Sequence, residues 1–288
     1  MSVEDDGNES EGLRQAREFQ APTEAKENAR LFSFSEIQAD DIKGIEEYLK
    51  FEIEQGFTTL NPKTTLEKQV AFRQSQIKEG KLKVVASKDN GKIIATSVVV
   101  LEKGTMGKDI ADNEAYAAGI LVDPDKRGAG IGGIGTAEQD RIAREAGKTA
   151  MRTIIANDNG PSTRLHFNVG YKLTGVAERK EETDYVYIKD LVKEPEAARP
   201  WKEEVLAGRL KLTRGEIDPS FPTELLIDGD DIETIKTALA QDYEGTALLR
   251  PEDFEKQGMI DRNAIIFAKK EKKIEIQIII NIFSQPKT

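Results

Sequence analysis

A glycine-rich segment is the part of this sequence whose residue types most clearly indicate chemistry. It runs from Gly128 to Gly133 and follows an apolar stretch that ends at Val122. Glycine has no Cβ atom, so successive backbone N–H groups can converge on phosphate oxygens, and the positive end of a following helix adds to the attraction. Arg127, directly before the first glycine, supplies a forked cation. The segment therefore predicts a binding site for a phosphate-bearing ligand.

Two widespread phosphate-binding motifs compete for this segment. Residues 128–133, and again residues 130–135, satisfy G-x-G-x-x-G, the dinucleotide pattern. That pattern begins directly at a strand end in a β-α-β unit, whereas residues 123–127 separate the apolar stretch from the first glycine here. A Walker A loop requires Gly-Lys followed by Ser or Thr, and no lysine directly follows these glycines. The dinucleotide interpretation stays an alternative, and the Walker A interpretation is excluded.

The elements that must position the glycines follow from hydrophobic periodicity. Residues 115–122 predict a strand before them, and residues 132–146 predict a helix after them. Asn90-Gly91 predicts a tight hairpin turn. The other predicted elements are a strand over 30–34, a helix capped by Ser35 or Asp40, a helix over 65–78, strands over 83–87, 92–101 and 149–155, a short helix over 162–169, and strands over 171–177 and 183–188. We therefore expect an α/β (α+β) domain with a mixed, mostly antiparallel sheet flanked by about four helices.

The chain beyond residue 193 is expected to form a second unit. Two prolines and several charges indicate a linker over 194–200, followed by a small α+β domain over 201–288. Its predicted elements are strands over 206–213, 223–227 and 264–268, a helix over 231–241 and a short helix over 252–256. Isoleucines alternate along residues 274–283 and predict a final strand, which as a paired edge would support a homodimer.

The composition excludes several classes of function. The chain of 288 residues has no cysteine and one histidine, so disulfides, a cysteine nucleophile and thiolate or histidine-rich metal sites are excluded. A formal net charge of -10 argues against a nucleic-acid-binding surface. No apolar run approaches the ~18 residues of a membrane span, so we expect a cytoplasmic protein without a membrane partner. Residues 1–30 are acidic and polar, and they predict a disordered tail.

Two motifs in order resemble those of the GNAT N-acetyltransferase superfamily. Residues 127–132 match its pyrophosphate loop, R/Q-x-x-G-x-G/A, after an apolar strand and a Val-Asp-Pro turn. Residues 159–171 resemble the family's N-x-x-S/A-x-x-L-Y/H-x-x-x-G-F/Y segment. The resemblance covers residues 31–193. It implies the GNAT fold, acetyl-CoA as the acyl donor, and a small-molecule or protein amine as the acceptor.

The resemblance also implies roles for individual residues. Backbone groups of Leu121 and Val122 would pair with the pantetheine arm. Asn159 and Ser162 would reach the pantetheine or the adenosine phosphate, with a helix cap as the alternative for Ser162. The backbone N–H groups that would bind the pyrophosphate belong to Arg127, Gly128, Ala129, Gly130, Ile131 and Gly132.

Proton transfer has less well-defined candidates. His166 stands where many family members have a tyrosine that protonates the departing thiolate. An unperturbed histidine pKa of about 6.5 makes it a candidate general acid. The alternative is an imidazole that packs on the short helix and bonds to backbone. Glu114 and Tyr116, or Glu52 and Glu54, are candidates for the general base, and none is fixed by spacing.

Two functions follow. The first is an N-acetyltransferase in which a primary amine attacks the thioester of acetyl-CoA directly. The second is a catalytically weak or inactive CoA-binding or scaffold protein whose C-terminal domain makes partner contacts. Release of CoA thiol in the presence of an amine distinguishes the two.

Overall fold

The computed structural model describes residues 32–57, 64–179, 182–193, 212–213, 217, 224–249 and 263–270. Its elements in chain order are β1 (Phe34–Glu36), α3 (Ile42–Glu54), α4 (Leu66–Lys78), β2 (Leu82–Asp89), β3 (Lys92–Val100), η1 (Thr105–Gly107), β4 (Glu114–Val122), η2 (Pro124–Lys126), α5 (Ile131–Glu145), β5 (Ala150–Ala156), α6 (Gly160–Asn168), β6 (Lys172–Arg179), β7 (Glu182–Asp190), β8 (Leu212–Thr213), β9 (Glu224–Asp228), α8 (Ile232–Ala240), β10 (Tyr243–Leu249) and β11 (Ala264–Lys269). The mixed sheet with flanking helices confirms the predicted fold class.

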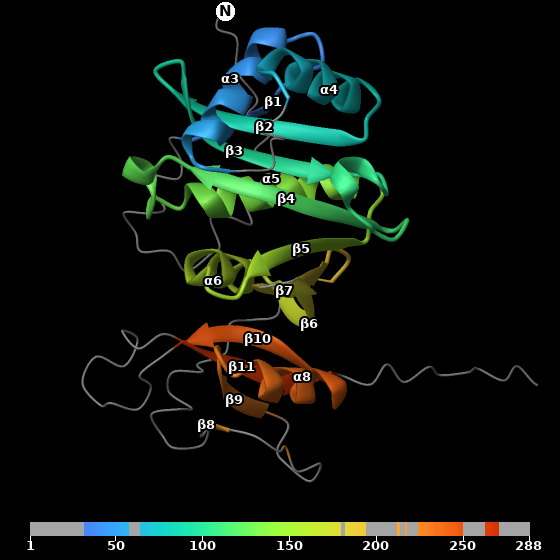
Figure 1. Ribbon diagram of the computed structural model, residues 1–288, viewed down its shortest axis with the longest axis vertical. Coiled ribbons are helices and arrows are strands. Elements are labelled where there is room, and N and C mark those ends of the chain that lie inside the picture. The colour runs from blue at the N-terminus through green and yellow to red at the C-terminus, as the bar shows by residue number, and fades with distance from the viewer. Residues whose placement is uncertain are drawn as a thin grey trace, which may run out of the picture.

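One sheet runs through the described part of the molecule (Figure 1). Its strand order is β1-β2-β3-β4-β5-β7-β6-β10-β11-β9-β8, and the neighbours are antiparallel except for the β4–β5 and β8–β9 pairs. The predicted hairpin between β2 and β3 is confirmed, since Asn90 and Gly91 have φ angles of 49° and 79°. Of these two parallel pairs, β4–β5 lies inside the sheet, with an antiparallel neighbour on each side.

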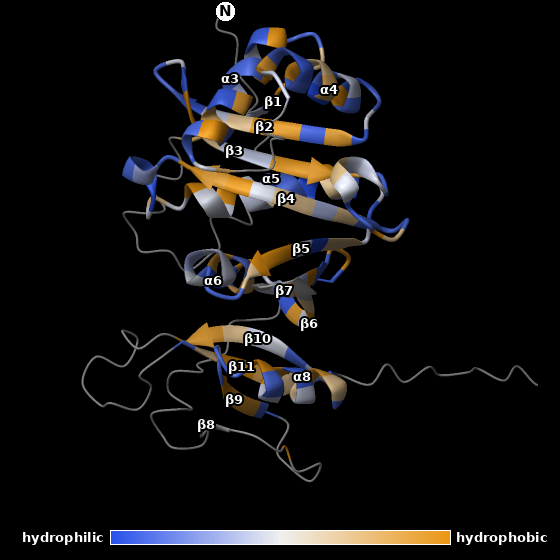
Figure 2. Cartoon of the chain, viewed as in Figure 1, coloured by the Kyte–Doolittle hydropathy of each residue, from blue (hydrophilic) through white to orange (hydrophobic). Residues whose placement is uncertain are grey.

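Helices cover both faces of the sheet. One apolar cluster joins α3 and α4 to β2, β3 and Tyr116 of β4. A second cluster joins α5, α6 and α8 to the opposite face. Apolar residues concentrate along several strands, while the helices carry a mixture of hydrophilic and hydrophobic residues (Figure 2). The glycine segment lies at the start of α5, between these layers and solvent.

Two predicted boundaries near the start of the domain were wrong. Strand β1 begins at Phe34 rather than Arg30, because only Phe34 to Glu36 pair with β2. The cap of α3 is Asp41, whose Oδ1 accepts from Gly44 N at 2.8 Å, and neither Ser35 nor Asp40 takes this role. Hydrophobic periodicity does not locate the end of a helix to within one residue, so it cannot identify which residue is the cap.

The C-terminal strands continue the sheet of the first domain. Gly245 of β10 pairs with Leu173 of β6, and Tyr185 Oη donates to Gly229 O at 2.6 Å. Strand β10 was not predicted, whereas β9, α8 and β11 were. The segments 252–256 and 274–283 and most of 206–213 lie outside the described residues, so these predictions stay untested. The division into domains at 194–200 also stays a prediction.

Among the described helices, none combines the length and apolar character needed to cross a membrane. Across all the residues that the structure describes, no cluster of three or more His, Asp or Glu side chains could hold a metal ion.

Candidate functional site

Strands β4 and β5 pair at one end and then separate, and we call the opening between them the fork. The two strands pair in parallel over three residues, and the last pair is Tyr116 with Arg152. Beyond it, residues 117–122 of β4 pair only with β3, while β5 pairs only with β7. Figure 1 shows the two strands diverging toward their arrowheads. The unpaired side of β4 extends over about 20 Å at 3.3 Å per residue.

Side chains hold the fork at its narrow end. Thr153, the first β5 residue past the ladder, donates from Oγ1 to Ala117 O at 3.1 Å. The ladder between β3 and β4 contains a bulge between Val98/Gly119 and the next pair. Gln139 of α5 donates from Nε2 to Val98 O at 3.1 Å and to Gly119 O at 3.3 Å. The carbonyls beside the bulge and the fork therefore have side-chain donors.

The direction of the β4 backbone follows from the ladder. Asp123 N donates to Ile94 O at 2.8 Å, so this pair is hydrogen-bonded. Hydrogen-bonded and non-bonded pairs alternate in an antiparallel ladder, so Leu121 also directs its backbone toward β3. Ile120 and Val122 direct theirs into the fork. Sequence reasoning missed Ile120, although its spacing of two from Val122 was the signal.

The glycine segment opens beside the wide end of the fork. Gly128 and Gly130 have φ angles of +82° and +81°, which residues with side chains rarely adopt. Gly130 is the N-cap of α5 and provides no side-chain bond. Within the described residues, the N–H groups of residues 128–132 donate to no other group. Five backbone N–H groups without printed partners, at the positive end of a helix, make this segment a candidate anion site.

Basic side chains flank this anion site. Arg127 is exposed, and its Nε donates to Val122 O at 3.1 Å, which fixes the stem of the guanidinium at the fork. Lys126 is engaged elsewhere, in a 2.9 Å ion pair with Asp89. The first turn of α5 contains no acidic residue. Arg127 is therefore the cation placed beside the free N–H groups.

The second predicted segment forms α6. Asn159 caps the helix by accepting from Ser162 N at 3.1 Å, so the cap is Asn159 and the alternative of Ser162 as cap was wrong. His166 is 5% exposed, and its Nδ1 lies 2.7 Å from Ser162 O. Its ring lies edge-on to Tyr171 with centroids 4.9 Å apart. Burial, together with the charge of Lys189, lowers the pKa of His166 to about 4. This environment matches the packing alternative.

The comparisons with known proteins identify the domain. Residues 47–171, which include the fork, the glycine segment and α6, match the model of the acetyltransferase (GNAT) family. This region is a GNAT acetyltransferase domain. The predicted family is thereby confirmed, and the donor used by this family is acetyl-CoA. A comparison with curated proteins finds no match to the chain.

Several solved structures resemble the GNAT domain. The protein yncA from Salmonella typhimurium, determined with its cofactor acetyl-CoA, is 18% identical, with a TM-score of 0.46, and the match covers 58% of this chain and 99% of that one. A GNAT-family acetyltransferase from Streptococcus pneumoniae is 17% identical, with a TM-score of 0.46 and coverage of 55% and 98%. The ribosomal-protein-S18-alanine N-acetyltransferase from Escherichia coli is 13% identical, with a TM-score of 0.43 and coverage of 58% and 99%.

The candidate bases of the GNAT domain lie in different environments. Glu114 forms a two-point ion pair with Arg152 at 2.9 and 3.0 Å. Burial raises its pKa, but bonds from Arg152 and Ala111 N outweigh this and the net shift is downward. Tyr116 is buried at the apex of the fork. Of these two residues, Tyr116 is the closer to the unpaired part of β4.

The two candidate bases in α3, Glu52 and Glu54, differ in their exposure to solvent. Glu54 is exposed. Glu52 is 2% exposed, accepts from Tyr48 Oη at 2.7 Å, and has its pKa raised by burial. Its Oε2 has no partner among the described residues. The chain after α3 reaches β4, since a Cβ on Gly119 would lie 3.1 Å from Phe57 Cζ. The end of α3 therefore borders the fork.

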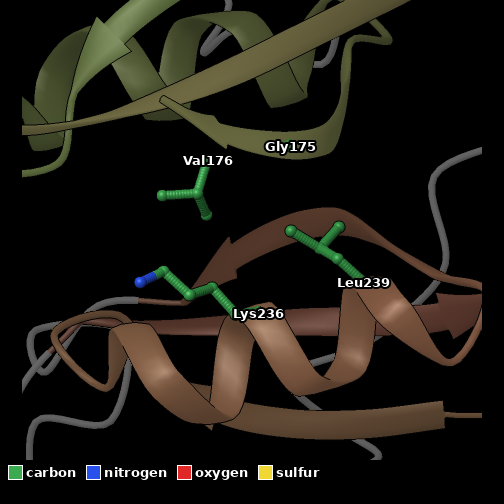
Figure 3. Close-up of a pocket in the computed structure, with 4 residues that line it drawn as sticks. All are labelled: Gly175, Val176, Lys236 and Leu239. Carbon is green, nitrogen blue, oxygen red and sulfur yellow. The ribbon is translucent and has the colours of Figure 1, made fainter. Parts of the chain in front are cut away.

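A separate pocket lies between β6 and α8 (Figure 3). Its lining consists of Gly175, Val176, Lys236 and Leu239. Strands β5 and β7 separate β6 from β4, so this pocket does not belong to the fork. Its one charged lining residue, Lys236, forms a 3.0 Å ion pair with Glu233.

Proposed function

We propose that this chain transfers the acetyl group of acetyl-CoA to a primary amine by direct attack. One observation carries the proposal, namely that a fork of unpaired β4 backbone opens onto an uncapped, glycine-rich helix N-terminus. A pantetheine arm is an extended amide chain, which a free strand edge binds, and a diphosphate is the anion that converging N–H groups bind. The two parts lie in the order in which they occur in CoA.

The donor is accommodated as follows. The N–H groups of residues 128–132 and the Arg127 guanidinium bind the diphosphate. The arm extends from there along β4 and bonds to the outward-facing backbone of Val122 and Ile120. The acyl end then lies toward the apex, beside Tyr116. Ile120 replaces Leu121 in this assignment, because the Leu121 backbone is directed toward β3. The predicted contacts of Asn159 and Ser162 with the donor stay predictions, and the Asn159 side chain is already engaged as the cap of α6.

The chemistry requires no protein nucleophile. The neutral amine attacks the thioester carbonyl carbon, a C–N bond forms, and the carbonyl oxygen gains negative charge. Backbone N–H groups of β4 aimed into the fork stabilise that oxygen. The C–S bond then breaks, the thiolate of CoA accepts a proton, and the amine loses one. His166 is neutral near pH 7 because of its lowered pKa, so we assign it to packing and leave thiolate protonation to solvent or Tyr116.

The proposal is tested at Gly133, in the first turn of α5. A Cβ there meets nothing within 4 Å, so a longer side chain is accommodated. Glutamate at this position suits a helix N-terminus and reaches back to its free N–H groups. Gly133→Glu should therefore raise stability by about 1 kcal/mol and weaken acetyl-CoA binding by at least tenfold.

The measurements are thermal unfolding and calorimetric titration with acetyl-CoA, with Gly133→Gln as the uncharged control. The glutamine variant should bind more tightly than the glutamate variant. Thiol release with a panel of amines then separates the enzyme from the CoA-binding scaffold, which binds without turnover. Failure of the folded wild-type chain to bind acetyl-CoA would refute the proposal.

A further inference from the structure

Two buried side chains donate hydrogen bonds to backbone carbonyls at the point where β4 and β5 separate. Thr153 is 5% exposed and bonds from β5 to Ala117 O of β4. Gln139 is fully buried in α5 and bonds to both carbonyls beside the β3–β4 bulge, Val98 O and Gly119 O. Both sets of bonds lie at the narrow end of the fork, just past the Tyr116–Arg152 pair. Neither residue belongs to the motifs that identified the domain.

We infer that Thr153 and Gln139 are positioning residues that keep the fork open and its backbone groups aimed at the pantetheine arm. The inference rests on the proposed function, because it assigns the fork to that arm. Neither side chain is placed in contact with the reacting atoms. Their effect is exerted through the geometry of β4.

Thr153 acts by occupying an acceptor. Ala117 O is the first β4 carbonyl past the last ladder pair, Tyr116 with Arg152, and it faces β5. A buried carbonyl requires a donor. Without the hydroxyl, the nearest donors are backbone N–H groups of β5, and their approach would extend the ladder by a rung. The fork would then shorten at the end where the acyl group lies.

Gln139 acts by stabilising the bulge. A bulge places one extra residue in β4 and locally disrupts the regular ladder. The two bonds from Gln139 Nε2 supply donors at that point. If the bulge were lost, the β4 register would slip by one residue, and every group past it would change sides. Leu121 would then face the fork in place of Ile120 and Val122.

The experiment compares two ligands on the full-length chain. Acetyl-CoA occupies both the glycine segment and the fork, whereas its nucleotide half, 3′-phospho-ADP, occupies the glycine segment alone. We expect Thr153→Val, which preserves shape, to weaken acetyl-CoA binding by roughly tenfold and to leave 3′-phospho-ADP binding unchanged. Thr153→Ser should restore acetyl-CoA binding, because it retains the hydroxyl.

Ser97→Ala is the matched control. The Ser97 hydroxyl is also buried and also bonds a backbone carbonyl, Gly135 O at 3.1 Å, but from β3 to α5. It should change stability without separating the two ligands. Gln139→Met serves as a second variant if Thr153→Val does not fold, and it should show the same preferential loss of acetyl-CoA.

The outcomes separate this inference from the proposed function. If the wild type binds acetyl-CoA and both variants bind it equally well, the positioning role is refuted and the donor assignment stands. Equal loss of both ligands would show a general structural role and would also refute it. If the wild type binds neither ligand, the proposed function itself fails.

Discussion

His166 is a neutral side chain at physiological pH, because its surroundings oppose the imidazolium. Burial is the larger cause, and the positive charge of Lys189 adds to it, so the pKa falls from 6.5 to about 4. The bond between Nδ1 and Ser162 O favours the charged form but does not compensate. An imidazole of this kind is a weak base, and at pH 7 it lacks the imidazolium proton that a general acid would donate.

The lowered pKa makes stability depend on pH in a defined direction. Between pH 6.5 and 4 the unfolded chain binds a proton at His166 that the folded chain does not, so stability falls as pH falls. The loss approaches about 3 kcal/mol at pH 4. His166→Phe removes this contribution. The difference in unfolding free energy between wild type and variant, measured by urea denaturation from pH 7 to 4.5, should therefore shift in favour of the variant.

The same variant tests catalysis. If His166 only packs, His166→Phe should keep kcat within about threefold, once an acceptor amine is known. A loss of a hundredfold or more, the range typical of a lost general acid, would return His166 to the catalytic site.

At the scale of elements, the contact between β10 and β6 depends on one glycine. A Cβ on Gly245 would lie 2.8 Å from Leu173 Cβ and 3.2 Å from Ile265 Cγ2. Both neighbours belong to strands, so neither can withdraw easily. An added methyl group at such a position overpacks the core.

Gly245→Ala should therefore destabilise the protein by about 1–3 kcal/mol, measured by urea denaturation. Gly175→Ala is the matched control, because a Cβ there meets Val186 Cβ at an ordinary 3.5 Å. Equal stability of the two variants would show that β10 can move away from β6 without cost.

The elements differ in how far the sequence predicts them. Helix α4 ends as expected before Gly80, whose φ of +70° only glycine adopts readily, and the β2–β3 hairpin follows from Asn90-Gly91. Strand β10 was missed because Tyr243 to Leu249 contains no clear alternation. It is stabilised by contacts with β6 and β11, which are distant in sequence, and such contacts override local preference.

The candidate site also contains some features that the sequence predicts and others that depend on contacts between distant segments. The glycine segment was predictable, since its conformation is local and specific to glycine. The roles of Thr153, Gln139 and Ile120 depend on strand register and on a bulge, which arise only when β3, β4, β5 and α5 come together. Periodicity identifies the strands but does not show where their pairing stops.

At the scale of the whole molecule, one apolar cluster extends through both parts of the chain. It joins Met151, Tyr171 and Tyr187 to Ile227 and Phe267. Each of these five side chains is at most 1% exposed. The C-terminal strands therefore cover apolar surface of the GNAT domain as well as their own.

Truncation after Lys193 should consequently lower the melting temperature and expose apolar surface, measured by thermal unfolding and binding of a hydrophobic dye. The comparison is the full-length chain under identical conditions. A truncated chain with unchanged stability would instead support the predicted independent domain over 201–288.

The fork also has a consequence for how the protein behaves in concentrated solution. It places a strand edge in the interior of the sheet, and a strand edge can template the addition of any extended peptide. Side chains bond to backbone carbonyls at both ends of this edge. The charged Arg127 bonds to Val122 O at the wide end, and Thr153 occupies Ala117 O at the narrow end. Charged residues beside an open edge oppose self-association, so the same arginine that suits an anionic ligand also protects the chain against aggregation.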